Sequence, residues 1–311
     1  MLPPMLHRPA PRAQSRAHTP ASRTPLLDHR LASDGGAPAP RRPTARKAMT
    51  DAPVGYEVRD GVAWITLNRP RVLNALDTGL AATLADHAEV AAADPDVTLV
   101  VVRGAGRAFC SGMDRTALAA GAIAEPFYRH WIRGLNRLED MPKVSLAVLH
   151  GHSIGGGLQL ALACDLRLAT DDAVLGLGAT RHGLIPDGAV LRLARVMGVG
   201  RAKELAILND EISPAEARAT GLVNWVCPAA ELDRTLERLV AKIRGASPTA
   251  AAHTKRLLHE SFHRDPRAMI EEMLRSQSAC MASWELDEAN RAWRDKREAV
   301  FYPPRRAERT S

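Results

Sequence analysis

Two short glycine-rich segments could place backbone N–H groups around a negatively charged oxygen atom. The first spans 106–114 (GlyArgAlaPheCysSerGlyMetAsp) and the second spans 151–157 (GlyHisSerIleGlyGlyGly). Small residues let a ligand approach the backbone, and the N–H groups of a first helical turn lack partners within their helix. Two such donors on one oxygen would stabilise an enolate or a tetrahedral oxyanion, by about 3 to 4 kcal/mol per donor. Either segment alone also fits a loop that serves only packing.

The order of the strand and helix patterns predicts an α/β core followed by a mainly helical region. AspGly at 60–61 predicts a tight turn between two strands, and continuous apolar runs predict buried strands. We expect strands at 56–59, 62–67, 98–103, 144–149, 174–177 and 222–226. We expect helices at 78–93, 125–139, 158–164, 188–197, 201–208, from 213, and near 229–244, 248–262, 266–283 and 285–298.

Taken together and in this order, the segments resemble the crotonase (enoyl-CoA hydratase/isomerase) superfamily from about Val54 to Phe301. The matching segments are 68–77 (AsnArgProArgValLeuAsnAlaLeuAsp), 108–114, 151–157, 164–169 (CysAspLeuArgLeuAla), 183–188 (GlyLeuIleProAspGly) and 219–224 (AlaThrGlyLeuValAsn). The resemblance implies an α/β fold, a crotonase-like spiral of ββα units. It also implies a C-terminal helical region that builds a homotrimer or a dimer of trimers. We therefore expect a core at 51–245 and the helical region at 246–311.

The resemblance also implies a site for an acyl-CoA thioester. The backbone N–H groups of Met113 and Gly156 would form the oxyanion hole. Coenzyme A would lie along 68–77 and 107–114, with basic residues of the helical region reaching a phosphate. The candidate substrate-binding residues are Arg71, Ala75, Arg107, Ala108, Ser111, Gly112, Gly155 and Gln159. We expect no metal and no separate cofactor, since coenzyme A is part of the substrate.

The chain departs from the family where hydratases carry two glutamates, because it has Gln159 and Ala179 there. A glutamine does not exchange a proton near neutral pH, and an alanine has no polar group, so hydration by paired glutamates is not expected. Asp187 resembles the aspartate that several isomerase-type members use. One carboxylate and one oxyanion hole suffice to move a double bond, so we predict an isomerase. On position alone, Asp187 could equally be the N-cap of the helix expected at 188–197.

Other functions stay open at this stage. Within the enzymes they are hydration, decarboxylation or thioester hydrolysis, and outside them a non-catalytic acyl-CoA-binding protein. GlyHisSerIleGly at 151–155 also matches the GxSxG pattern of serine hydrolases, with Ser153, Asp187 and His253 in the Ser–Asp–His order. We disfavour it because His253 lies in a helical pattern and no HisGlyGly-type loop precedes the serine.

The sequence gives less specific predictions for one segment and two residues near these motifs. The variable segment at 115–140 contains Phe127, Tyr128, His130 and Trp131, which could line an acyl pocket or form a helix packing face. We expect Asp114 to be a structural hydrogen-bonding residue. We expect His182 to be packed or exposed rather than catalytic.

The charge of the chain lies in its N-terminal segment. Residues 1–48 carry nine basic residues against two acidic ones, an excess equal to the net charge of +7, and nine of the 21 prolines. The remaining chain has 33 basic and 33 acidic residues, so we expect no nucleic-acid surface on the folded part. We predict residues 1–50 to be a disordered basic extension. There are two alternatives. The segment could be a transit-type leader, or it could be absent from a mature protein that begins at Met49.

The remaining composition is that of an ordinary globular protein. Nearly half of the 311 residues are apolar and a quarter are charged. The four cysteines (Cys110, Cys164, Cys227 and Cys280) lack paired or metal-ligand spacing, which favours a reducing compartment. No apolar run reaches the roughly 18 residues that a membrane span needs. We therefore expect a cytoplasmic protein without a membrane partner.

Overall fold

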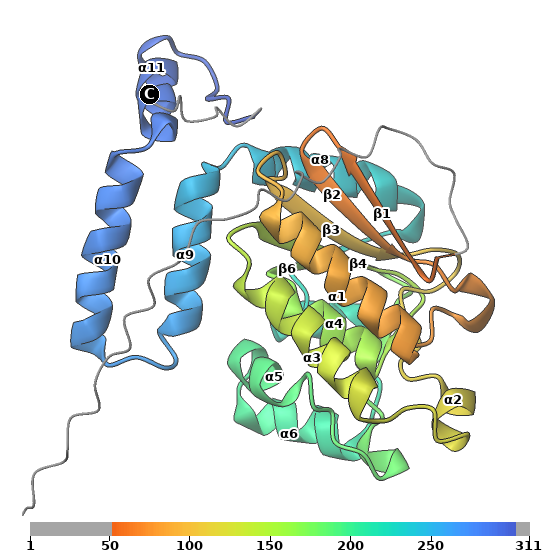
Figure 1. Ribbon diagram of the computed structural model, residues 1–311. Coiled ribbons are helices and arrows are strands. Elements are labelled where there is room, and N and C mark those ends of the chain that lie inside the picture. Colours follow the sequence, from red (N-terminus) through yellow and green to blue (C-terminus); the bar gives the residue numbers. More distant parts are fainter. Residues whose placement is uncertain (1–51, 303–311) are drawn as a thin grey trace, which may run out of the picture. The chain divides into compact units, whose positions relative to one another are not determined.

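The central element of the fold is a mostly parallel β-sheet (Figure 1). The computed structural model describes residues 52–302. The extension predicted at 1–50 lies outside the described residues. Six strands pair in the order β1-β2-β3-β4-β6-β8, and only the β1–β2 pair is antiparallel. Their bounds are β1 (Val54–Arg59), β2 (Val62–Leu67), β3 (Leu99–Gly104), β4 (Val144–Leu149), β6 (Leu166–Thr170) and β8 (Trp225–Cys227).

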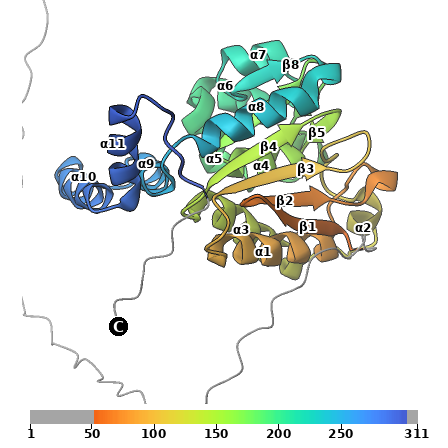
Figure 2. The same cartoon turned by 90° about the horizontal axis from the view of Figure 1, so that it is seen from above.

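Alternating residues of the central strands face two separate apolar layers. Val100 and Val102 of β3 belong to the larger core, whereas Leu99 and Val101 belong to the smaller one. Helices α1 (Thr78–Ala93), α3 (Glu125–Asp140) and α4 (Gly156–Ala163) complete the larger core, and α8 (Leu232–Arg244) covers the other face (Figure 2). Because both faces are covered, β3 and β4 are mostly apolar along their length, as buried parallel strands are.

The sequence patterns predicted most of these elements. AspGly at 60–61 forms the turn between β1 and β2, with Asp60 and Gly61 both at positive φ. A second, two-stranded sheet pairs β5 (His152–Ile154) with β7 (Val174–Gly176). The α/β core followed by helices is confirmed, and no helix of residues 52–302 is long and apolar enough to cross a membrane.

The remaining helices follow β7 or lie between the core strands. They are α2 (Arg115–Ala119), α5 (Val190–Met197), α6 (Val199–Leu208), α7 (Pro214–Ala219), α9 (Pro248–Glu260), α10 (Pro266–Met281) and α11 (Trp284–Arg294). Short 3₁₀ turns occur at η1 (Pro70–Val72), η2 (Thr180–His182) and η3 (Ala229–Glu231). The strand expected at 222–226 is shorter and later, since Leu222 and Val223 pack into the core before β8 begins.

Lys255 attaches α9 to the core. Its ammonium group donates to the carbonyl oxygens of Leu138 and Lys143 and to the carboxylate of Asp165, at 2.9–3.0 Å. Asp165 also accepts from the Ser145 N–H at the start of β4. The Lys255 side chain is only 10% exposed, so this charge is held by fixed partners rather than by water. Helix α10 packs against α9 in turn (Figure 1).

Strand β6 was not predicted as a strand, and its second residue gives the physical reason. Arg167 interrupts the apolar pattern, yet its side chain is buried. The guanidinium donates to the carbonyl oxygens of Leu222 and Cys164 at 2.7 Å and of Ala161 at 3.4 Å. The charge therefore joins β6 to α4 and to the segment before β8, which a pattern of apolar residues cannot show.

Replacing Arg167 by lysine is expected to lower the free energy of unfolding by about 2 kcal/mol, because a single ammonium group cannot reach all three carbonyl oxygens. Denaturant unfolding followed by circular dichroism measures the change. Arg129→Lys is the matched control, since Arg129 forms an exposed ion pair with Glu125. That control should change stability by less than about 0.5 kcal/mol. Equal effects of the two substitutions would contradict the role given to Arg167.

Candidate functional site

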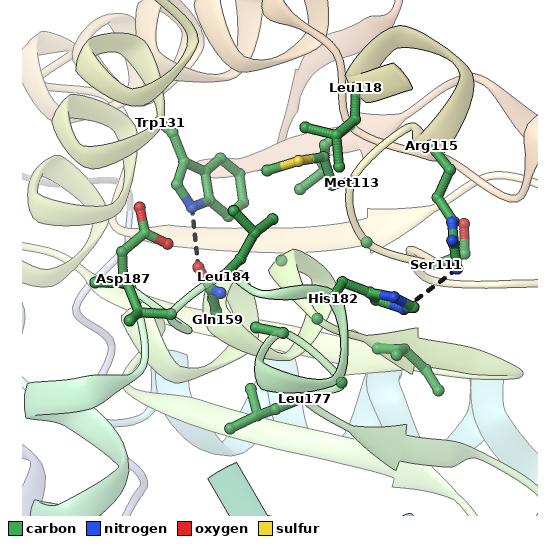
Figure 3. A pocket seen from close by; sticks show the side chains of 18 of the residues that line it. Ser111, Met113, Arg115, Leu118, Trp131, Gln159, Leu177, His182, Leu184 and Asp187 are labelled. Atoms are coloured by element: carbon green, nitrogen blue, oxygen red, sulfur yellow. Dashed lines mark hydrogen bonds between the residues drawn. The ribbon is translucent and has the colours of Figure 1, made fainter. Parts of the chain in front are cut away.

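A cavity of about 500 Å³ lies where the two glycine-rich segments meet. Segments far apart in the chain line it: 111–115, residues of α3, the start of α4, and the loop that leads to α5 (Figure 3). Most of its wall is apolar, and Asp187 is the one carboxyl group on it among residues 52–302. An apolar cavity with a few fixed polar groups is the usual form of a small-molecule site.

The two glycine-rich segments contact each other directly. Gly112 has φ +92°, and a methyl group added to it would lie 2.9 Å from the Ile154 carbonyl oxygen and 3.5 Å from the Gly156 nitrogen. Only glycine suits both the backbone conformation and the space. The carbonyl of Gly112 and the N–H of Asp114 bond to the backbone of Leu76.

Met113 and Gly156 each bring an unpaired N–H group to this junction. Leu76 bonds to the residues on either side of Met113, which leaves the Met113 N–H without a partner among the described residues. Gly156 is the first residue of α4, so its N–H has no acceptor within the helix. Both residues line the cavity. Two free N–H donors and the positive end of the α4 dipole therefore lie on the wall of one cavity, and these are groups that can stabilise a negatively charged oxygen.

Asn74 holds the first glycine-rich segment in place. It is fully buried at φ 57°, and its amide nitrogen lies 2.8–3.1 Å from the carbonyl oxygens of Ala105, Ala108 and Phe109. Its amide oxygen accepts from the Arg69 N–H at 2.8 Å. Asn74 was not singled out from the sequence, although an asparagine between apolar residues in a tight turn was a usable signal.

Arg69 completes this support by binding two helix caps. Its guanidinium lies 3.1 Å from the carboxylates of both Asp77 and Asp114. Asp77 caps α1, and Asp114 caps α2 by accepting from Thr116 and Ala117. The Ala117 N–H, together with Arg69, holds the pKa of the Asp114 carboxyl below its usual value. The structure thus gives Asp114 the hydrogen-bonding role that the sequence led us to expect.

Gln159 joins helix α4, which begins at Gly156, to the loop that carries Asp187. Its amide oxygen accepts from the indole N–H of Trp131 at 3.1 Å (Figure 3). It also accepts from the backbone N–H of Gly188 at 3.1 Å. The side chain is buried except where it lines the cavity. Ala179 lies on the wall as well and contributes no polar side chain.

Asp187 lies in the cavity wall and not at a helix end. Helix α5 begins at Val190 with Ala189 as its N-cap and has no side-chain cap, so the alternative prediction of an Asp187 N-cap is wrong. Asp187 lies within a tight turn at 185–189 that precedes the helix. The Asp187 side chain lines the cavity (Figure 3). Burial raises the pKa of this carboxyl above 3.8, although the Gly188 N–H and Arg192 act in the opposite direction.

The described residues do not form the serine-hydrolase arrangement. Strand β5 turns Ser153 into the core, where its hydroxyl is buried and has no hydrogen-bond partner within residues 52–302. His253 lies on α9 and lines a different cavity, between that helix and the end of α3. The GxSxG pattern is therefore a feature of packing here, and this alternative is wrong.

The other candidate residues divide into two groups. Ser111, Gly112, Gly155 and Gln159 line the cavity together with Met113, Gly156 and Asp187. Arg71 and Arg107 are exposed outside its wall, while Ala75 and Ala108 are buried and their carbonyls accept from Arg69 and Asn74. Phe127 and Trp131 line the cavity and are also buried in helix packing. That the cavity holds an acyl group stays a prediction. His182 is exposed at the cavity, 3.2 Å from Arg115.

Asn74→Asp is expected to lower both the stability and the activity of the protein. The aspartate still accepts from Arg69 but places a carboxylate against three carbonyl oxygens, which costs about 3 kcal/mol. The Met113 N–H then loses its fixed position. Thermal unfolding and a turnover assay measure the two effects. Asn209→Asp is the control, because Asn209 also has positive φ but is not at the cavity. Unchanged activity in Asn74→Asp would contradict this role of Asn74.

Asp187→Asn is expected to stabilise the fold at about pH 7 and to have no such effect near about pH 3. The folded pKa is raised above the unfolded one, so the ionised carboxylate destabilises the fold above the folded pKa. This penalty vanishes as the pH falls and the carboxyl is protonated in both states. Denaturant unfolding at several pH values measures the difference. The exposed Asp172→Asn serves as the control, and a destabilised Asp187→Asn protein at neutral pH would oppose the argument.

Known proteins show the same sequence order and fold. The sequence model of the family described as enoyl-CoA hydratase/isomerase matches residues 57–303. A Bacillus subtilis protein named as a putative enoyl-CoA hydratase/isomerase (YngF) is 32% identical over 245 residues, 77% of this chain and 94% of its own. A peroxisomal Δ(3,5)-Δ(2,4)-dienoyl-CoA isomerase of Arabidopsis thaliana is 30% identical over 253 residues, 76% of this chain and 91% of its own.

A solved structure agrees with the fold. A Thermobifida fusca protein named as a putative enoyl-CoA hydratase was solved in complex with acetoacetyl-CoA. It is 32% identical to this chain and superposes with a TM-score of 0.68. The match covers 74% of this chain and 95% of that one. These likenesses confirm the crotonase-like fold expected from the order of the motifs.

Proposed function

Because the chain belongs to the enoyl-CoA hydratase/isomerase family, we propose that it is an acyl-CoA isomerase that uses Asp187 as its single proton carrier. One observation carries this proposal. Asp187 is the one carboxyl group that lines the cavity in the described part of the chain, and the same wall carries two candidate oxyanion donors. A double-bond shift requires one base and a stabilised enolate, and this site offers that set.

The proposed reaction has two proton transfers. The Asp187 carboxylate removes a proton from the carbon on one side of the double bond, and the C–H electron pair moves through the π system to the thioester oxygen. The N–H groups of Met113 and Gly156 stabilise the negative charge on that oxygen. Protonated Asp187 then returns the proton to the other end of the π system, which moves the double bond and restores the carboxylate.

The raised pKa of Asp187 suits this role. A carboxylate with a raised pKa is a stronger base than an ordinary aspartate, and its protonated form persists long enough to return the proton. Hydration requires a group that activates water in addition. Gln159 does not titrate near neutral pH, and its amide oxygen already accepts two hydrogen bonds. Among the similar proteins, one is named as an isomerase and another as a hydratase, so their names do not separate the two reactions, and the cavity wall favours the isomerase.

The relatives and the surface support two further parts of the proposal. The Thermobifida fusca complex supports an acyl-CoA substrate, with Arg71 and Arg107 as exposed cations available to the phosphates. We also propose a trimer or a dimer of trimers. Exposed apolar side chains on the C-terminal helices support it, among them Leu258, Ile270, Leu274 and Met281. The proposed reaction needs neither metal nor separate cofactor.

Deuterium incorporation tests the reaction. The enzyme is incubated with a panel of enoyl-CoA thioesters in deuterated water, and products are followed by mass spectrometry and absorbance. Wild type should incorporate deuterium and move the double bond without gaining water. Asp187→Ala and Asp187→Asn should lose at least about a hundredfold in rate, the usual contribution of a general base. A gain of one water that survives both substitutions would instead indicate a hydratase.

The dependence of the rate on pH provides a second test. Activity should fall as the pH falls through the pKa of Asp187, because only the carboxylate accepts a proton. Since burial raises this pKa, the acidic limb should lie above 3.8, the ordinary value for aspartate. The initial exchange rate against pH measures it. An acidic limb that is unchanged in Asp187→Asn would assign the base to another group.

A further inference from the structure

The orientation of the Gln159 amide follows from the chemistry of its two neighbours. The indole N–H of Trp131 and the backbone N–H of Gly188 are both donors and cannot accept. The group 3.1 Å from each of them must therefore be the amide oxygen of Gln159. A flipped amide would place its own N–H groups against two donors, so the amide nitrogen is turned away from both.

Both neighbours of Gln159 are themselves fixed. Trp131 is 2% exposed and stacks on Phe127 with ring centroids 6.2 Å apart. A methyl group added to Gly188 would lie 2.5 Å from Leu135 and 2.7 Å from the Gln159 amide oxygen, so only glycine permits this approach. The Gly188 carbonyl also accepts from Arg192 at 2.9 Å. Gln159 thus cannot turn without breaking a buried network.

The amide nitrogen of Gln159 has no acceptor in the described part of the chain. Gln159 lines the cavity, and both of its hydrogen bonds within residues 52–302 use the amide oxygen. Asp187, the neighbour of Gly188 in sequence, is not joined to this nitrogen by a hydrogen bond among those residues. A donor fixed in a mainly apolar wall favours a ligand that supplies an oxygen acceptor, because an unpaired donor is costly once water is excluded.

We propose that Gln159 donates a hydrogen bond to a second oxygen of the acyl chain, so that the site selects acyl-CoA thioesters bearing a carbonyl or carboxylate oxygen beyond the thioester. This inference rests on the proposed function, because the thioester oxygen is there assigned to the N–H groups of Met113 and Gly156. Two donors occupy the two lone pairs of that oxygen. The Gln159 donor, one helical turn after Gly156 on α4, is thereby left for another part of the substrate.

Gln159→Glu isolates the donor from the rest of the network. A glutamate carboxylate still accepts from Trp131 and Gly188, so the buried contacts of the loop are kept. It removes the N–H donor of the amide and adds a negative charge, so its effect is judged on two ligands of equal charge. The measurements are made at about pH 8, where an ordinary glutamate is ionised and cannot donate.

Calorimetric titration with two matched ligands tests the proposal. Acetoacetyl-CoA has a ketone oxygen that accepts, and butyryl-CoA lacks it. Wild type should bind acetoacetyl-CoA about tenfold more tightly, the worth of one good hydrogen bond. Gln159→Glu should lose this preference, and Trp131→Phe, which frees the amide, should reduce it. Equal affinities in wild type, or an equal loss for both ligands in Gln159→Glu, would overturn the proposal.

A third variant separates this inference from the proposed function. Asp187→Asn should keep the preference for acetoacetyl-CoA, because the substitution leaves the Gln159 donor in place, while it loses deuterium exchange. Exchange that persists in Asp187→Asn would remove the isomerase assignment without touching the ligand preference. A preference that is absent while exchange still depends on Asp187 would overturn only the role of Gln159.

Discussion

The hydrogen bonds of one buried carboxamide, Asn74, set the position on which the rest of the site depends. They join the loop before α1 to the carbonyl oxygens of Ala105, Ala108 and Phe109, so that the next residues reach the start of α4. At this junction the backbone N–H groups of Met113 and Gly156 face a common cavity. A backbone N–H group cannot be turned by a side-chain rotamer, so its direction is determined by the hydrogen bonds that fix the surrounding loop.

The site separates its fixed groups from its reactive one. Met113, Gly156 and Gln159 present donors whose directions are set by the backbone or by a buried network. Asp187 is the group that we propose exchanges a proton, and its burial raises its pKa at a cost to stability. Fixed donors need no reorganisation when charge develops, which is the advantage of a preorganised site. Active sites commonly have such a local loss of stability at the reactive residue.

The amide of Gln159 also shows why one atom changes the chemistry. Glutamine and glutamate have the same shape, and either could accept from Trp131 and Gly188. Only the glutamate could move a proton near neutral pH, and only the glutamine offers a permanent donor to the cavity. The packing around this position is therefore compatible with both reactions, and the proposed isomerisation rests on the identity of one atom.

The sequence by itself determined the α/β core, the order of the motifs, and the family, because apolar periodicity and the spacing of glycines are local properties of the chain. It also singled out Met113, Gly156, Gln159 and Asp187, all of which line one cavity. Strand β6 and the support by Asn74 and Arg69 were missed. The side chains of Arg167, Asn74 and Arg69 bind partners that are distant in the sequence, and Leu222 lies 55 residues from Arg167. Only the tertiary structure buried Ser153, released Asp187 from a helix cap, and oriented the Gln159 amide. Each of these depends on which donors and acceptors packing brings together, and the spacing of residues along the chain does not contain that information.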